Sequence, residues 1–357
     1  RQLGLAFNAV LGVIMSLFLS LGAGTILSGV GVADALMQPA KTYLQIVGGF
    51  CILNALIPIC SSYLRAFGFS KEPLYASIIG NVINFCLNAF FLFVLHKGVA
   101  GVATATVISR IINLVIVVLL GAVLVKAKQH PERESNRAVM GQIIRIGLPS
   151  ACETAIYNVS MTLVIRFLNQ MDAQGLNVTA RSYTMQITNF SYCVGAALAQ
   201  ANAIMTGWHI GAKEYDACDR GTKKAAVIGV IVAVILETVF TLCSGWIMQL
   251  FSKDPQMVSL VGKLLAIDIV LEIGRVTNLV YGQALKTSGD AVFPVVMGAC
   301  FMILCSVGGT YLFGIRLGLL AVGAYIGMTG DECVRAVGMY LRWKSGKWKE
   351  KGLVKSR

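Results

Sequence analysis

The sequence predicts an all-α integral membrane protein built from two related halves. The chain is 56% hydrophobic and only 13% charged, and its mean hydropathy is +0.73, which is outside the range of soluble domains. Its apolar runs reach the length of about 20 helical residues that crosses a bilayer core. The segment Leu64–Pro73 is echoed by Leu285–Pro294, with a basic residue, a glycine and a proline at the same offsets.

The apolar runs give the predicted spans in order. Backbone groups inside lipid need internal hydrogen-bond partners, so we expect helices and not open strands. The ten predicted spans are 3–27, 39–64, 74–95, 99–125, 143–168, 176–208, 222–250, 257–285, 291–314 and 318–342.

The basic residues predict the topology. Most of the 30 Lys and Arg residues lie at one alternating set of span ends, including the 126–142 loop and the tail after Arg342. This positive-inside pattern predicts that residue 1, the 126–142 loop and the C-terminus are cytoplasmic. Topology therefore explains the net charge of +13, and we expect the lipid bilayer, and not a nucleic acid, as the partner of the chain.

The echoed segments predict the domain organisation. They relate the second span to the eighth, and this even separation gives both halves the same orientation, as in secondary transporters built from parallel repeats. The eighth span is the fourth of its half, so we expect twelve spans in two six-helix lobes, ten of them visible. The predicted parts are an incomplete four-helix N-terminal lobe at 1–125, a cytoplasmic linker at 126–142, a six-helix C-terminal lobe at 143–342 and a basic cytoplasmic tail at 343–357.

Three ionisable residues share one face of the 257–285 span. Asp268, Glu272 and Arg275 are spaced i, i+4 and i+7, and ionisable groups inside the membrane need a partner, a cavity or a function. One interpretation is a site that exchanges a proton or another cation, since a buried carboxylate binds protons or ions more readily than an exposed one. The other is a buried Glu272–Arg275 ion pair that holds the helix in place.

A fourth carboxylate lies at the start of the 143–168 span. Glu153 follows Pro149 by one turn, with Tyr157 on the same face and Asn158 beside it. We expect Glu153 to attract a cationic substrate or to coordinate the coupling ion. The alternative is a hydrogen-bonded carboxylate favoured by the positive end of the helix dipole.

Other polar residues inside spans have weaker interpretations. Gln186 and Asn189 are either neutral ligands of a cavity or interhelical hydrogen-bonding groups. Glu237 lies in the middle of its span, so we expect a partner on another helix. Asp331 and Arg335, spaced i and i+4, are predicted to form a structural pair. Trp343 and Trp348, among Lys and Arg, suit a membrane-surface segment.

Several motifs together resemble one transporter family. They are RIGLPS at Arg145–Ser150 followed by Glu153, RSYTMQITNF from Arg181, the Asp268–Asn278 segment, and ALKTSGD ending at Asp290. Over nearly the whole chain the combination resembles the multidrug and toxic-compound extrusion (MATE) family, most closely its bacterial members. The resemblance implies a V-shaped, multi-pass antiporter of the bacterial inner membrane. It would export cationic drugs and other organic cations by alternating access, driven by H⁺ or Na⁺.

Other functions receive less support from the sequence. It has no GxxxxGK[ST] motif, so we expect no direct use of ATP. No catalytic constellation and no Cys/His cluster stands out, so we expect no enzyme, no metal site and no cofactor. As to assembly, we expect a monomer. The alternative within the same broad superfamily is a flippase for a lipid-linked precursor, whose cavity should be cationic. The carboxylates of the second lobe favour cationic cargo instead.

Overall fold

The computed structural model describes residues 2–30, 34–125, 136–172 and 175–351, and within these ranges it contains helices and no strand. The chain divides into two compact units, Arg1–Ile143 and Ile144–Arg357. Residues 126–135 of the predicted linker lie outside the described ranges. The rest of the predicted linker is helical, because the helix that follows it begins at Asn136.

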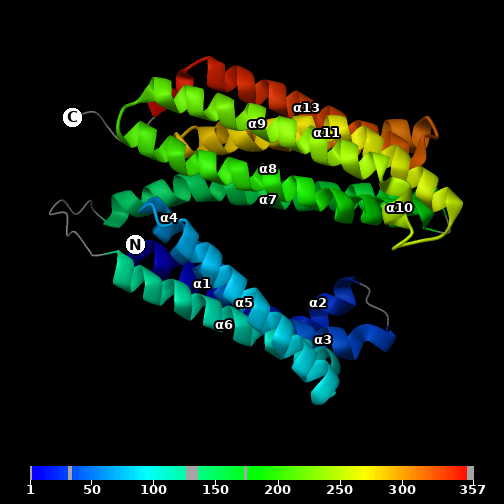
Figure 1. The fold of residues 1–357 in the computed structure, drawn as a ribbon, viewed down its shortest axis with the longest axis horizontal. Helices are drawn as coiled ribbons and strands as arrows, with labels where there is room; N and C mark the ends of the chain where they lie inside the picture. Colours follow the sequence, from blue (N-terminus) through cyan, green and yellow to red (C-terminus); the bar gives the residue numbers. More distant parts are fainter. Residues whose placement is uncertain (1, 31–33, 126–135, 173–174, 352–357) are drawn as a thin grey trace. The chain divides into compact units, whose positions relative to one another are not determined.

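The first unit contains the helices of the first four predicted spans (Figure 1). Two of the predicted spans are broken, and one ends in a π-helical segment. The elements are α1 (Gln2–Leu21), α2 (Ala23–Val30), α3 (Asp34–Gly49), α4 (Ile52–Ala66), α5 (Lys71–Ala89) with the π-helix η1 (Phe90–Val94), and α6 (Gly98–Leu124).

The second unit contains the helices of the other six predicted spans (Figure 1). They are α7 (Asn136–Met171, which starts before the unit boundary), α8 (Leu176–Gly211), α9 (Tyr215–Leu242), α10 (Ser244–Met248), α11 (Pro255–Thr287), α12 (Val292–Phe301) with the π-helices η2 (Met302–Val307) and η3 (Thr310–Arg316), and α13 (Leu320–Lys344). The short 3₁₀-helix η4 (Lys347–Lys351) follows.

Helix α11 is the central helix of the second unit. It packs against α8, α9 and α13, and its N-terminus is capped by the Asp254 carboxylate, which accepts a hydrogen bond from the Gln256 amide at 2.9 Å. At Gly274 an added Cβ would lie 2.9 Å from the backbone nitrogen of Cys333 on α13. Glycine therefore lets the backbones of α11 and α13 approach closely, which brings the polar side chains of both helices together.

Part of the helical framework is suited to crossing a membrane by length and apolar character. Five helical stretches of the described residues meet that condition, and a pair bent by 41° would make a sixth: Gly4–Leu21, Lys71–Val94, Gly98–Leu124, Tyr215–Leu242, Val292–Arg316, and the pair Met37–Gly49 with Ile52–Ala66. Helices α7, α8, α11 and α13 lie at the remaining predicted spans but carry more polar side chains. The number of ten spans therefore stays a prediction.

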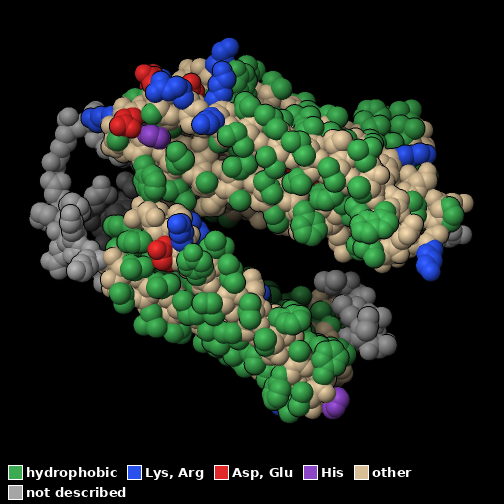
Figure 2. Space-filling view, viewed as in Figure 1, with side chains coloured by type: hydrophobic (Ala, Val, Ile, Leu, Met, Phe, Trp, Pro, Cys, Tyr) green, Lys and Arg blue, Asp and Glu red, His purple; other side chains and the backbone are tan. Residues whose placement is uncertain are grey.

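Large apolar side chains cover much of the outside of the helices. Phe85 and Phe93 are each 75% exposed, and Leu242 is 80% exposed. Figure 2 shows hydrophobic side chains along the helices, while the charged ones gather mostly near helix ends. A water-soluble protein rarely exposes apolar surface on this scale, so these faces are suited to contact with lipid.

The expectation that Trp343 and Trp348 lie at a membrane surface is wrong. The two indole rings are buried and stacked, with centroids 4.1 Å apart and an interplanar angle of 9°. Trp343 donates from Nε1 to Asp219 Oδ1 on α9 at 2.7 Å. Tyr215 packs edge-on against Trp348. Both rings belong to a buried apolar core that includes Cys218 and Ala226 of α9, so the segment after α13 packs against the protein.

Candidate functional site

Helix α11 places the predicted acidic residues inside the second unit. Asp268 is 2% exposed and Glu272 is fully buried. The α-helical spacing puts them on one face together with Arg275, as the sequence predicts. Because α9 and α13 both pack against α11, these side chains are enclosed by other helices and do not face lipid.

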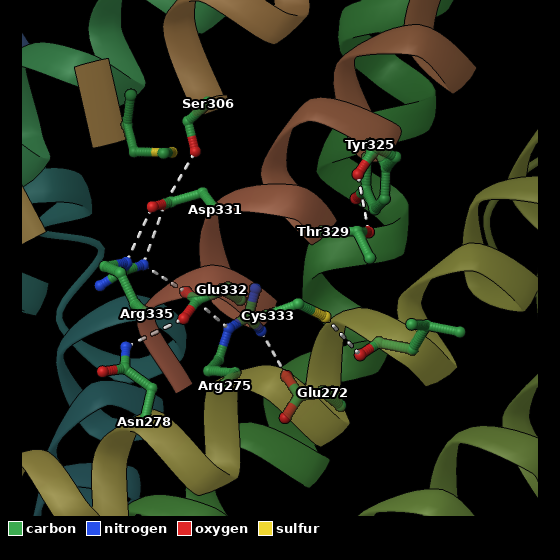
Figure 3. A network of polar contacts seen from close by, with 12 residues as sticks. Glu272, Arg275, Asn278, Ser306, Tyr325, Thr329, Asp331, Glu332, Cys333 and Arg335 are labelled. Carbon is green, nitrogen blue, oxygen red and sulfur yellow. Dashed lines mark hydrogen bonds and ion pairs between the residues drawn. The ribbon is translucent and has the colours of Figure 1, made fainter. Parts of the chain in front are cut away.

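Arg275 is the cation of this face of α11. Its guanidinium forms an ion pair with Glu272 Oε1, and its Nε lies 3.7 Å from Glu332 Oε1 on α13. Figure 3 shows Arg275 between the two carboxylates. The ion pair that was one of the two interpretations of Glu272 and Arg275 is therefore present, and it is shared with a residue of a neighbouring helix.

Helix α13 carries a second arginine with its own carboxylates (Figure 3). Arg335 donates to Asp331 through Nε at 2.8 Å and through NH2 at 3.0 Å, and its NH2 also lies 3.0 Å from Glu332 Oε1. Ser306 donates to Asp331 at 2.9 Å, and Asn278 donates to Glu332 at 3.0 Å. Asp331 and Arg335 therefore form the pair that the sequence predicts, inside a network whose hydrogen bonds join α11, η2 and α13.

Glu237 on α9 is the residue that the sequence analysis left outside the site. It is fully buried, and an oxygen of its carboxylate lies within 4.8 Å of oxygens of Asp268 and Glu272. The charged groups that α11 brings beside Glu237 are carboxylates, and among the described residues no Lys or Arg forms the expected ion pair with it from another helix. The signal in the sequence was a lone carboxylate in the middle of an apolar span; no pattern along the chain shows which helix it meets.

We call Glu237, Asp268 and Glu272 the three-carboxylate cluster. Its carboxylates have unused hydrogen-bonding capacity. Within the described residues no hydrogen-bond partner reaches either oxygen of Glu237, Asp268 Oδ2 or Glu272 Oε2. Buried polar atoms are almost always hydrogen-bonded in native proteins, and like charges at this separation repel strongly in a low-dielectric interior. Protons or bound cations would relieve both costs.

Glu153 lies apart from the cluster and has its own cation. Its Oε2 is 2.6 Å from Nζ of Lys286, near the C-terminal end of α11, and both side chains are about one-fifth exposed. Gly298 on α12 lies beside the Glu153 side chain, and an added Cβ there would be in ordinary van der Waals contact with Glu153 Cγ at 3.5 Å. The sequence analysis gives Lys286 no role in the site, because a contact between α7 and the end of α11 is not encoded in local spacing.

The other predicted site residues are at the surface of the second unit. Tyr157 is 41% exposed. Asn158 is exposed and donates to the Thr154 carbonyl of its own helix. Gln186 and Asn189 are exposed on α8. The structure therefore does not bring these four residues into the three-carboxylate cluster.

The donor set of the cluster indicates which ligands it suits. Its available atoms are carboxylate oxygens, which are hard ligands that favour protons, alkali and alkaline-earth cations over softer transition metals. The sequence analysis expects no metal site because it finds no Cys/His cluster. These three carboxylates could nevertheless hold a hard cation.

Known protein families, relatives and solved structures match this chain over most of its length. The family model MatE matches residues 2–90 and 149–312. "Uncharacterized transporter YisQ" of Bacillus subtilis is 33% identical over 353 residues, covering 97% of this chain and 77% of that protein. "Probable multidrug resistance protein YoeA" of the same organism is 22% identical over 365 residues, covering 98% and 77%. A solved MATE structure in a straight conformation superposes with a TM-score of 0.86 at 19% identity, covering 97% of this chain and 78% of that one.

Proposed function

The chain belongs to the MatE family of efflux transporters, and we propose that it is an antiporter that exports organic cations in exchange for H⁺ or Na⁺. Its family and its apolar helices make it a multi-pass membrane protein. We further propose that it acts as a monomer in a bacterial inner membrane, with a cytoplasmic C-terminus and without a cofactor or ATP.

The observation that carries the proposal is the buried acidic cluster of α9 and α11. Asp268 and Glu272 keep oxygens without a hydrogen-bond partner inside a protein embedded in lipid. Ionisable groups at such depth are expensive, and they are typical of ion pathways and proton relays. A structural role alone would be better served by full pairing, which the neighbouring Asp331–Arg335 pair achieves.

Coupling requires that the ion affinity of the site differ between the two orientations of the transporter. A ligand shifts a conformational equilibrium only by its differential affinity for the two states. Ion binding at Asp268 and Glu272 would favour the orientation in which cargo is released, and loss of the ion to the cytoplasm would reset the cycle. Arg275, bound to Glu272, would hold that carboxylate in position through both halves of the cycle.

The cargo would bind to the exposed polar and aromatic residues of the second unit. Tyr157 offers a ring face for an organic cation, and Asn158, Gln186 and Asn189 are exposed and able to hydrogen-bond it. Glu153 supplies the negative charge, but Lys286 already pairs with it. A cationic cargo would therefore replace Lys286 at this carboxylate.

Flux from proteoliposomes tests the function. The protein is reconstituted with a fluorescent organic cation inside, and a proton gradient and a sodium gradient are imposed separately. We expect export under one gradient, and loss of gradient-driven export in the Asp268→Asn variant but not in Glu214→Gln, an exposed carboxylate in the α8–α9 loop. Absence of export under both gradients, with translocation of a lipid-linked sugar, would replace the proposal by the flippase alternative.

A further inference from the structure

Glu237 is the most unusual buried side chain of the second unit. It lies in the middle of α9, is fully buried, and has no hydrogen-bond partner for either carboxylate oxygen among the described residues. An ionised carboxylate moved from water into a protein interior costs several kcal/mol even after relaxation. A leucine would fill the same place at no such cost, so the carboxylate needs a ligand to explain it.

The surroundings of Glu237 add negative charge. Carboxylate oxygens of Asp268 and Glu272 lie within 4.8 Å of its own. Of these two neighbours, Glu272 forms an ion pair with Arg275. The hydroxyl of Ser191 on α8 is also fully buried without a hydrogen-bond partner, and α8 packs against both α9 and α11.

The two arginines of this polar network form ion pairs with other carboxylates and not with Glu237 or Asp268. Arg275 is committed to Glu272 and Glu332. Arg335 is committed to Asp331 and Glu332, and these two carboxylates also accept hydrogen bonds from Ser306 and Asn278. Among the described residues, no Lys or Arg forms an ion pair with Glu237 or Asp268. The three-carboxylate cluster therefore has two carboxylates without an ion-pair partner among the described residues, which ions from outside the protein would supply with positive charge.

We propose that the three-carboxylate cluster is a cation site that takes up two monovalent positive charges, with Glu237 as the acceptor of the second. The proposal rests on the ion coupling proposed above and assigns its charge stoichiometry. The ligand is a small hard cation because the available donors are all oxygens, and the coupling proposed above makes it H⁺ or Na⁺. A cation bound at the cluster would also link α9 to α11, since Glu237 lies on α9 and Asp268 and Glu272 lie on α11.

This stoichiometry determines the electrical character of transport. Two monovalent ions that enter for each monovalent organic cation that leaves carry a net positive charge inward. Without the Glu237 carboxylate, one ion would exchange for one cargo cation, and the exchange would carry no net charge. An inside-negative membrane potential should therefore accelerate transport by the unmodified protein and have no effect on a Glu237→Gln variant.

The experiment measures cargo flux and transient current on the same proteoliposomes, with the proton gradient or the sodium gradient applied alone. We expect an inward current in the unmodified protein under the gradient that drives export. In Glu237→Gln the current should be lost, while slower, electroneutral export remains. Glu237→Asp keeps a carboxylate and should retain current, and the exposed Glu214→Gln is the matched control.

Binding measurements guard against a variant that fails to fold. Because no Lys or Arg among the described residues forms an ion pair with Glu237, its replacement by the equally large Gln removes no ion pair, and the melting temperature without added ion should not fall. The upward shift of melting temperature that Na⁺ or acid gives the unmodified protein should be smaller in the variant. Electroneutral export by the unmodified protein, an undiminished current in Glu237→Gln, or stabilisation by Ca²⁺ in place of a monovalent ion would overturn the proposal. Absence of any gradient-driven export would instead overturn the proposed function.

Discussion

The three-carboxylate cluster and the Glu153–Lys286 pair place the same kind of side chain in contrasting settings within one unit. At the end of α11, Lys286 lies 2.6 Å from the Glu153 carboxylate, and both side chains keep some exposure. In the middle of α11, Asp268 and Glu272 are joined by Glu237, all three are buried, and several of their oxygens have no partner.

The contrast shows how the supply of cations divides the roles of the acidic residues. Where Lys or Arg is at hand, the carboxylate has an internal counterion, and an incoming cation has to compete with it. In the cluster only Glu272 has an arginine among the described residues as an ion-pair partner, so the interior remains short of positive charge, and ions from the two aqueous sides can supply it. We infer that the paired residues shape and stabilise the unit and tune cargo binding, while the cluster binds the coupling ion.

The largest effect is expected from breaking the buried pairs of α13. Arg335→Met leaves Asp331 without an ion-pair partner and leaves Glu332 only the longer contact with Arg275, and removing one partner of a buried ion pair typically costs about 3–5 kcal/mol. Thermal unfolding of the detergent-solubilised protein measures the loss. Arg220→Met, at an exposed position of α9, is the control.

A second substitution separates lost pairing from lost packing in that variant. Asp331→Asn added to Arg335→Met removes one of the charges left behind, so part of the stability should return. An unfolding temperature that stays as low in the double variant would show that the arginine acts through packing and not through charge.

A smaller loss is expected from separating α11 and α13. The Cβ of Gly274→Ala would lie 2.9 Å from the backbone of Cys333, which cannot rotate away, so the two helices must move apart. Overpacking of this kind costs about 1–3 kcal/mol. The shift would also move Arg275 away from Glu332, so gradient-driven export should slow.

Gly282→Ala on the same helix is the matched control for this prediction. Its Cβ would meet only the Asn278 side chain, at an ordinary 3.9 Å, and alanine favours helix over glycine by about 0.5–1 kcal/mol. It should leave stability equal or higher. A similar loss in both variants would contradict the close approach at Gly274.

The two settings also differ in how far the sequence predicts them. The spacing of Asp268, Glu272 and Arg275 along one helix predicts their shared face, because helical periodicity is local. The apolar runs likewise predict the helices, such as 99–125 for α6 (Gly98–Leu124) and 257–285 for α11 (Pro255–Thr287). Contacts between helices are not local, so the meeting of Glu237 with α11 and of Lys286 with Glu153 required the structure.

Helix ends and the tail show a second limit of the sequence. Helix α7 begins at Asn136, within the polar segment that was predicted to be a linker, because hydropathy reports burial in lipid and not the backbone conformation. Trp343 and Trp348 lie among basic residues, but they stack on each other and are buried against α9. A pattern of aromatic and basic residues does not show whether its rings face lipid or the protein.

An intermediate effect on cargo is expected from removing the internal counterion of Glu153. In Lys286→Met the carboxylate no longer has a cation to exchange, so an organic cation should bind more tightly. Because the pair is partly exposed, we expect a gain of about 1 kcal/mol or less, or roughly fivefold in Kd. Titration of a fluorescent cation into the purified protein measures the gain.

Lys263→Met, at an exposed position of the same helix, is the control for the general loss of a positive charge. An equal gain in both variants would attribute the effect to the overall charge of the unit. A weaker affinity in Lys286→Met alone would show that Lys286 positions Glu153 for the cargo and does not compete with it.

The smallest effect is expected at the exposed aromatic residue on the face of Glu153. Tyr157→Leu keeps apolar bulk but removes the ring face, and a cation–π contact at an exposed site contributes about 0.5–1 kcal/mol, or roughly two- to fivefold in Kd. Tyr192→Leu is the matched control, since both tyrosines are 41% exposed and Tyr192 lies on α8 outside the predicted site. Equal losses at the two tyrosines would mean that the cargo contacts aromatic surface without preference. A loss confined to Tyr157 would place the cargo beside the paired carboxylate, and so separate the cargo position from the ion cluster at the middle of α11.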